Sequence, residues 1–251
     1  MRAYFILLIY LLSIAINSIS SKKEFKSVKF LGKKQKLNIS LQFSKFSGKD
    51  LKKYLLNQKV YIIDTRDMTI SAKGYIPNSI LLPLSMYSWL SSVLPSGSDA
   101  IIITDEQNKN TAIEQFISLK QYNLLGYCIY DEVNENTSFN IQEVEYNPNT
   151  KESIQKIVDN NDYIIDIREV SEFKETGVIE QAKLIPLTTF QTNYNQIPSD
   201  GDVYVFCKSG MRAVVGMTYA KRAGYINRLV IMEGGMNKAI QEGYPLVPYS
   251  G

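Results

Sequence analysis

The chain of 251 residues contains no histidine and only two cysteines. Without histidine there can be no Ser-His-Asp triad, no Cys-His protease pair and no zinc hydrolase of the HExxH type. Two cysteines are too few for a disulfide framework or a four-thiolate zinc site. Any catalysis must therefore use cysteine, carboxylates, lysine, arginine, tyrosine or backbone amides.

The chain also lacks a large excess of one charge, since 28 Lys and Arg residues face 25 Asp and Glu residues, a net charge of +3. This small excess gives no indication of a nucleic-acid partner. Apolar residues make up 45% and charged residues 21% of the chain, values typical of globular proteins. The length corresponds to two domains or one large one.

The first 20 residues have the layout of a secretory signal peptide. One arginine precedes an apolar run over residues 4–16, and small residues follow at Ser18 and Ser20. The run is shorter than the roughly 20 residues that span a bilayer. We therefore predict a protein of the secretory pathway or a secreted one, with no stable membrane span after cleavage. An uncleaved membrane anchor and a mitochondrial targeting segment are the alternatives.

Residues 21–44 form a basic leader, in which residues 22–36 carry seven lysines and one glutamate. We interpret the leader as a solvated segment, because it lacks the interleaved aromatic residues of nucleic-acid grooves. Two sequons, at Asn38 and Asn136, agree with the secretory pathway.

One pattern occurs twice along the chain. The corresponding segments are residues 60–67 and 163–169, 100–104 and 203–207, and 128–131 and 230–233. A period of about 100 residues is too long for a solenoid and indicates two tandem copies of one domain. We place the copies at 45–135 and 151–251, joined by a polar, turn-rich linker at 136–150.

Each copy has the pattern of a small α/β domain. Its apolar runs are short, rich in Ile and Val and not alternating, which is typical of parallel strands covered on both faces. Helices are expected between these runs, at 51–56, 111–121, 154–158 and 213–223. The predicted fold is α/β, with one small open parallel sheet flanked by helices in each copy. Ligands of such sheets bind at the carboxyl ends of the strands.

Cys207 lies at such a strand end, before a six-residue loop that leads into a helix. Backbone N–H groups and the start of the helix can favour a thiolate there, and Lys208 and Arg212 add positive charge. Gly210 permits a positive φ, as a tight cradle requires. The planar fork of Arg212 suits an oxyanion. The loop therefore predicts a nucleophilic cysteine beside an anion site.

Four motifs in a fixed order resemble the rhodanese domain. They are Asp-x-Arg-Glu-x-x-Glu-Phe at 166–173, Cys-x-x-Gly-x-Arg at 207–212, Glu-Gly-Gly at 233–235 and Gly-x-Pro at 243–245. The resemblance covers residues 150–248 well. It is degenerate over 45–135, where residues 104–109 replace the cysteine loop with a sequence that lacks the Cys and the Gly.

The resemblance implies a sulfurtransferase that carries sulfur as a persulfide on Cys207. The donor would be a molecule such as thiosulfate, and the acceptor cyanide or a thiol. The resemblance implies a cradle made by the backbone amides of Lys208, Ser209, Gly210, Met211 and Arg212. Arg212 would help orient the donor anion, whereas Asp166 and Arg168 would brace the fold. The first copy would be catalytically inactive. It would pack against the second copy and form one wall of the active-site cleft.

Two other functions remain open: a non-enzymatic binding module of the same fold and a Cys-dependent phosphatase. Four residues separate Cys207 from Arg212, whereas related phosphatases have five, which disfavours the phosphatase. Cys128 lies in a predicted strand of the other copy, so we expect a buried structural cysteine with no disulfide to Cys207. No metal or organic cofactor is called for, and the sequence leaves the oligomeric state open.

Overall fold

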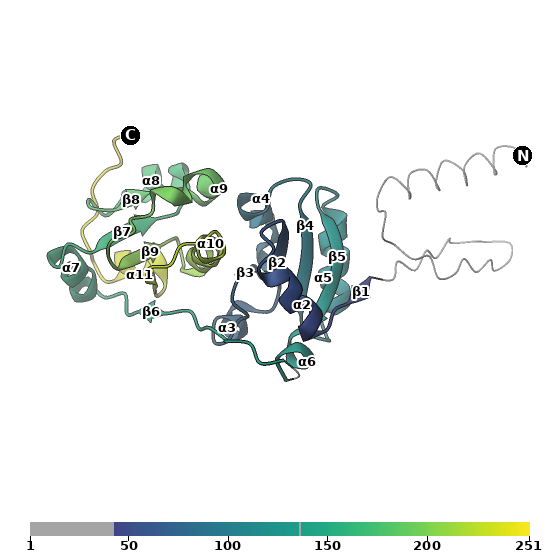
Figure 1. Ribbon diagram of the computed structural model, residues 1–251. Helices are drawn as coiled ribbons and strands as arrows, with labels where there is room; N and C mark the ends of the chain where they lie inside the picture. Colours follow the sequence, from purple (N-terminus) through teal and green to yellow (C-terminus); the bar gives the residue numbers. More distant parts are fainter. Residues whose placement is uncertain (1–42, 136) are drawn as a thin grey trace, which may run out of the picture. The chain divides into compact units, whose positions relative to one another are not determined.

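The computed structural model describes residues 43–135 and 137–251 (Figure 1). The predicted signal peptide 1–20, nearly all of the basic leader and the asparagines of both sequons lie outside these residues. Within the described part of the chain, none of the helices has the length and apolar character needed to cross a membrane.

A first five-stranded sheet is built from residues 44–129, with strand order β1-β5-β4-β2-β3. Its strands are β1 (Ser44–Lys45), β2 (Val60–Asp64), β3 (Ser79–Leu81), β4 (Asp99–Thr104) and β5 (Asn123–Ile129). The pairs β2–β3, β2–β4 and β4–β5 are parallel. Its helical segments are α2 (Gly48–Leu55), α3 (Met68–Ser71), η1 (Leu84–Trp89), α4 (Leu90–Val93), α5 (Lys109–Ser118) and α6 (Tyr130–Glu135).

A second five-stranded sheet repeats this topology, with strand order β6-β10-β9-β7-β8 and parallel pairs throughout. Its strands are β6 (Tyr146–Asn147), β7 (Tyr163–Asp166), β8 (Lys183–Leu184), β9 (Val203–Phe206) and β10 (Leu229–Met232). Its helical segments are α7 (Lys151–Asp159), α8 (Val170–Thr176), η2 (Leu187–Thr189), α9 (Phe190–Asn193), η3 (Tyr194–Gln196), α10 (Met211–Arg222) and α11 (Gly235–Gln241). The two sheets of matching order confirm the predicted α/β class.

Several boundaries differ from the predicted ones. Residues 146–147, placed in the linker by the sequence, form β6, because Tyr146 pairs with Ile231 of β10. Residues 130–131, which the repeat matches with residues 232–233, begin α6, whose first turn holds the acidic Asp131 and Glu132 that favour a helix start. Helix α2 begins at Gly48 rather than at 51, because Ser47 and Asp50 form a capping box at its start.

Each sheet has its own apolar core. One core gathers Ile62, Ile101 and Cys128 from the first sheet, and the other gathers Ile164, Phe206 and Met232 from the second. Cys128 is completely buried and free, and burial raises its pKa to about 12. The buried position in a strand of the first copy that was predicted for Cys128 is therefore confirmed.

Helix α10 of the second half contacts the first sheet along strand β3. The Leu81 N–H of this edge strand donates to Thr218 Oγ1 at 3.1 Å, so an amide that could pair with a foreign strand is satisfied. The buried Arg222 donates to the carbonyl oxygens of Gln58 and Val60, at 3.0 Å each. These contacts fix the helix whose first turn borders Cys207.

A buried ion pair closes the end of β7. Arg168 Nε donates to both carboxylate oxygens of Asp166, at 3.1 and 2.8 Å, and the two side chains are 2% and 0% exposed. The remaining nitrogens donate to Thr176 Oγ1 at 2.6 Å and to the Gly177 carbonyl at 2.8 Å. The pair thus joins the end of β7 to the end of α8, in agreement with the bracing role expected for it.

Replacing Arg168 by methionine is expected to lower the free energy of unfolding by about 3–5 kcal/mol, because Asp166 is left buried without its counter-ion. Arg228→Met is the matched control, since Arg228 pairs with Glu145 at the surface, where such pairs contribute at most about 1 kcal/mol. Urea unfolding of both variants measures the difference. Equal losses would show that the Asp166–Arg168 pair is not the brace.

Candidate active site

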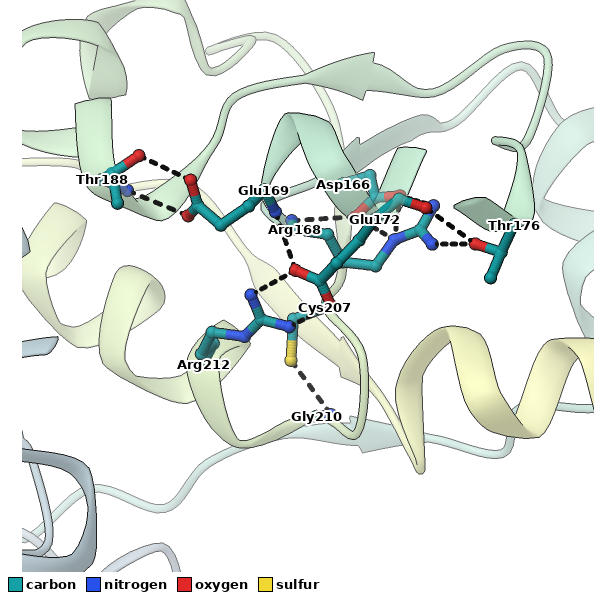
Figure 2. A network of polar contacts seen from close by, with 9 residues as sticks. All are labelled: Asp166, Arg168, Glu169, Glu172, Thr176, Thr188, Cys207, Gly210 and Arg212. Atoms are coloured by element: carbon teal, nitrogen blue, oxygen red, sulfur yellow. Dashed lines mark hydrogen bonds and ion pairs between the residues drawn. The ribbon is translucent and has the colours of Figure 1, made fainter. Parts of the chain in front are cut away.

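Cys207 is the first residue after β9, and its side chain is completely buried. Its Sγ accepts a hydrogen bond from the Gly210 N–H at 3.1 Å (Figure 2). Gly210 has φ 94°, a left-handed conformation that glycine adopts without strain, and it caps α10. The predicted positive φ at Gly210 is confirmed, whereas α10 begins at Met211 and not at 213.

The sulfur lies among backbone amides, as the motif implied. Burial has the largest effect on the pKa of Cys207 and raises it, while the N–H groups of Ala213, Ser209 and Gly210 act on the sulfur in the opposite direction. Ser209 and Gly210 were expected in the cradle, but Ala213 was not. Because the first N–H groups of any helix lack intrahelical partners, the earlier start of α10 accounts for the contribution of Ala213.

The pKa of Cys207 nevertheless shifts in the direction opposite to the one expected from the sequence. Burial raises the pKa of the thiol, and the amides and the charge of Arg212 lower it without compensating. The sequence shows the helix start and the basic neighbours, but it does not show that the sulfur is withdrawn from water. Desolvation penalises the thiolate and dominates here.

Because burial raises the pKa of the Cys207 thiol, we expect its thiolate to form at a higher pH than the thiolate of an exposed cysteine. The measurement is the ultraviolet absorbance of the thiolate, taken as wild type minus Cys207→Ser across a pH titration. The buried Cys128 is present in both proteins, so its contribution cancels. A thiolate signal already complete at pH 7 would contradict this assignment.

The guanidinium of Arg212 is bound by the protein itself. Its Nη1 and Nη2 donate to the two carboxylate oxygens of Glu172 at 2.6 and 2.7 Å. The guanidinium also lies 4.9 Å from the centre of the Trp89 ring, which η1 of the first half provides. The fork that was expected to orient a donor anion is thus occupied by a carboxylate.

Glu172 belongs to the site, although its place in the motif at 166–173 gave no indication of this role. Burial acts to raise the pKa of Glu172, but hydrogen bonds from Arg212 and from the Glu169 N–H outweigh burial and hold this pKa below its usual value. Figure 2 shows its carboxylate directed at Arg212. The capping-box spacing of Glu169 and Glu172 was visible in the sequence, but it indicates a helix start and not a partner for Arg212.

Gly235 allows α11 to approach the back of the cysteine loop. The Met236 N–H donates to the Cys207 carbonyl at 2.7 Å, and the Asn237 N–H donates to the Lys208 carbonyl at 3.0 Å. Gly235 has φ 58°, and a Cβ there would lie 2.3 Å from the Cys207 carbonyl oxygen. The Glu-Gly-Gly motif therefore allows the start of α11 to hold the backbone of the cysteine loop in place.

Lys208, Ser209 and Met211 have exposed side chains. Lys208 also borders a cavity of about 190 Å³ between α8 and α11. The lining residues of this cavity are Arg168, Glu172, Glu175, Thr176, Lys208, Met236, Asn237 and Ile240. Among the residues that the structure describes, no cluster of three or more metal-ligating side chains occurs.

The matching loop of the first sheet has a different chemistry. Register places Thr104, fully buried, where Cys207 stands in the second sheet. The Asp105 carboxylate accepts the Asn108 N–H at 2.7 Å, so a side chain of the loop itself occupies the start of α5. A hydroxyl cannot form a persulfide, and these contacts agree with the inactivity expected for this copy.

Comparisons with known proteins place the second sheet in a family. The model of the rhodanese-like domain matches residues 150–242, a range that contains β7 to β10 and the cysteine loop. A protein of Allochromatium vinosum called a sulfurtransferase is 31% identical over 98 residues, which are 39% of this chain and 90% of that protein. The chain therefore belongs to the rhodanese family.

Several solved structures are similar to parts of this chain. The reduced CoADR-RHD of Bacillus anthracis is 31% identical and has a TM-score of 0.34; the match covers 38% of this chain and only 16% of that one. A thiosulfate sulfurtransferase of Pseudomonas aeruginosa is 16% identical over 82% of this chain and 43% of its own, with a TM-score of 0.36. A rhodanese-like domain protein of Staphylococcus aureus is 27% identical over 40% of this chain and 97% of its own, with a TM-score of 0.34.

Proposed function

We propose that the protein is a sulfurtransferase that moves sulfane sulfur from a small-molecule donor to cyanide or a thiol through a persulfide on Cys207. The observation that carries the proposal is the position of this sulfur at the start of α10, with the Gly210 N–H directed at it from 3.1 Å. Family membership and the related sulfurtransferase support the same activity.

The reaction proceeds in two displacements. In the first, the Cys207 thiolate attacks the outer sulfur of a donor such as thiosulfate. The S–S bond of the donor breaks, and sulfite leaves with the bonding electron pair. A nucleophile such as cyanide then attacks the outer sulfur of the persulfide, forms thiocyanate and releases the Cys207 thiolate.

The cradle serves the persulfide more directly than it serves the free thiol. The outer sulfur of the persulfide carries negative charge that backbone N–H groups can stabilise without reorganisation. The dipole of α10, a helix of 12 residues, adds partial positive charge at the same end. A buried thiol of raised pKa is thus compatible with a stable charged intermediate.

The first copy, residues 45–135, has a supporting role in this proposal. It contributes Trp89, which stacks on Arg212, and strand β3, which contacts α10. Its loop carries no thiol, so the reaction takes place in residues 151–251 alone.

Thiocyanate formation from a sulfane donor and cyanide tests the proposal, together with the intact mass of the protein after exposure to the donor. We expect transfer and an adduct of one sulfur atom per chain. If no adduct forms with any donor, the proposal fails and the binding module becomes the better account. Hydrolysis of a phosphate ester, measured in parallel, would instead support the Cys-dependent phosphatase.

We also propose that residues 1–20 direct the protein into the secretory pathway. The supporting feature is the arginine followed by the apolar run and small residues. N-terminal sequencing of the protein secreted by a suitable host is expected to begin near residue 21. An intact Met1 in a membrane fraction would favour an uncleaved anchor, and a mitochondrial fraction would favour a targeting segment.

A further inference from the structure

The Arg212 guanidinium is held by two residues that approach it from different directions. Its Nη1 and Nη2 donate to the Glu172 carboxylate at 2.6 and 2.7 Å, and the centre of the Trp89 ring lies 4.9 Å from its central carbon. A bidentate carboxylate binds the edge of the planar guanidinium, whereas an aromatic ring stacks on its face. The Arg212 side chain is 10% exposed. The second copy therefore fixes one side of this charge, and the first copy fixes another.

Trp89 belongs to the copy without a nucleophile, in a segment that the second copy holds in place. Trp89 is the last residue of η1 and is half-buried. Two residues further along, the Ser91 carbonyl accepts a hydrogen bond from Gln191 Nε2 at 2.6 Å, and α4 contacts η2 and α9. Earlier in the chain, the Leu81 N–H donates to Thr218 of α10 at 3.1 Å. These contacts keep Trp89 beside the first turn of α10.

The position of Arg212 is important because its charge acts on the Cys207 sulfur. Burial has the largest effect on the pKa of Cys207 and raises it, whereas the neighbouring amides and the positive charge of Arg212 oppose burial. The carboxylates of Glu172 and Glu169 also act on Arg212, so its charge is partly balanced. A charge acts more strongly through protein than through water. By covering one face of the guanidinium, the Trp89 ring keeps water from that face and maintains the effect of Arg212 on the sulfur.

The first copy contains a second contact of the same kind, which provides a comparison. The centre of the Tyr130 ring lies 3.3 Å from the guanidinium carbon of Arg66, and Arg66 forms a buried ion pair with Asp64. The loop of this copy carries Thr104 in place of a cysteine. Loss of either ring removes one cation–π contact, but only the loss of Trp89 affects an arginine of the cysteine loop.

We propose, resting on the sulfur transfer proposed above, that Trp89 is a positioning residue of the active site, and that the first copy sets the reactivity of Cys207 through the contact between Trp89 and Arg212. The ring holds the guanidinium where its charge favours the thiolate that attacks the donor. The two displacements are unchanged, because Trp89 forms and breaks no bond and exchanges no proton.

The pH midpoint of thiolate formation at Cys207 is the first readout. It is measured on the full chain by ultraviolet absorbance, as the difference between each variant and the same variant with Cys207→Ser. Trp89→Leu removes the ring and should raise the midpoint, since water then screens the charge of Arg212. Trp89→Phe keeps an aromatic face and should have a midpoint near that of the wild type. An unchanged or lowered midpoint in Trp89→Leu would overturn the proposal.

A double-mutant cycle on the rate of sulfur loading shows whether Trp89 acts through Arg212. Loading from thiosulfate is followed by intact mass at a single pH. Trp89→Leu should slow loading about threefold to tenfold, the range that the free energy of one cation–π contact gives. In a protein that already carries Arg212→Met, the same substitution should change the rate less than about twofold. Equal effects of Trp89→Leu with and without Arg212 would contradict the proposal. The pH midpoints provide the same cycle if Arg212→Met loads too slowly to measure.

Tyr130→Leu is the matched control, because it removes a ring from Arg66 in the same copy. It should leave the midpoint and the loading rate unchanged at a temperature where the variant is folded. Slowing as large as that of Trp89→Leu would reveal a general weakening of the first copy and would also overturn the proposal. Trp89→Met, which keeps bulk but not the ring, replaces Trp89→Leu if that variant does not fold. If the wild type takes up no sulfur from any donor, the sulfurtransferase itself fails, while the midpoints still test Trp89.

Discussion

The Cys207→Ser variant is expected to take up no sulfur and to transfer none, whichever sulfane donor is offered. The hydroxyl of serine can occupy the same place beside the Gly210 N–H, so the loop keeps its hydrogen bond. A serine oxygen, however, cannot form a persulfide, and the thiolate is the nucleophile in this chemistry. We expect a complete loss of sulfur loading and of sulfur transfer. Intact mass measures the loading, and thiocyanate formation measures the transfer.

Cys128→Ser is the control for that loss, because Cys128 is the other cysteine of the chain and lies in the core of the first sheet. It should keep its sulfur loading at a temperature where the variant is folded. Sulfur loading that survives in Cys207→Ser and disappears in Cys128→Ser would show that Cys128, and not Cys207, carries the sulfur.

Gly235→Ala is the second substitution for which we expect a large effect. A Cβ at this position would meet the Cys207 carbonyl oxygen at 2.3 Å and the Gly210 nitrogen at 2.8 Å. The positive φ and the clash together should lower the free energy of unfolding by about 2–5 kcal/mol. Because the clash falls on the loop itself, sulfur loading should fall about 100-fold or more in the folded fraction.

Gly243→Ala is the control that separates the effect of the Cβ clash at Gly235 from the effect of a positive φ alone. Gly243 also has a positive φ, 71°, but a Cβ there would have no atom within 4 Å. This variant should lose only about 1–2 kcal/mol of stability and keep its loading rate. Thermal unfolding and loading rates of the two variants provide the comparison, and similar loading rates would show that close approach of α11 does not shape the cysteine loop.

The central strands and the cysteine loop were predictable because their signals are local. The Ile-rich runs of β2 and β7 indicate buried parallel strands from their own composition, and Gly210 marks the turn before α10 within three residues of Cys207. Strand β6 was not predictable, because two residues form a strand there only through pairing with β10, far along the chain.

The state of the site depends on contacts that the loop sequence does not contain. Glu172 meets Arg212 from 40 residues away, and Trp89 reaches Arg212 from the first half. The raised pKa of Cys207 likewise follows from burial of the sulfur, which the basic residues near it in the sequence do not indicate. Local sequence therefore predicted the nucleophile, while tertiary structure determines its charge and the groups available to a donor.

Separation of the two half-reactions tests the persulfide on Cys207 most directly. The protein is loaded with a sulfane donor, freed of donor by gel filtration, and then mixed with cyanide. The account predicts an adduct of one sulfur atom on the peptide that contains Cys207, and release of one thiocyanate per loaded chain in the absence of donor. Thiocyanate that forms only while donor and acceptor are present together, with Cys207 unmodified throughout, would contradict it.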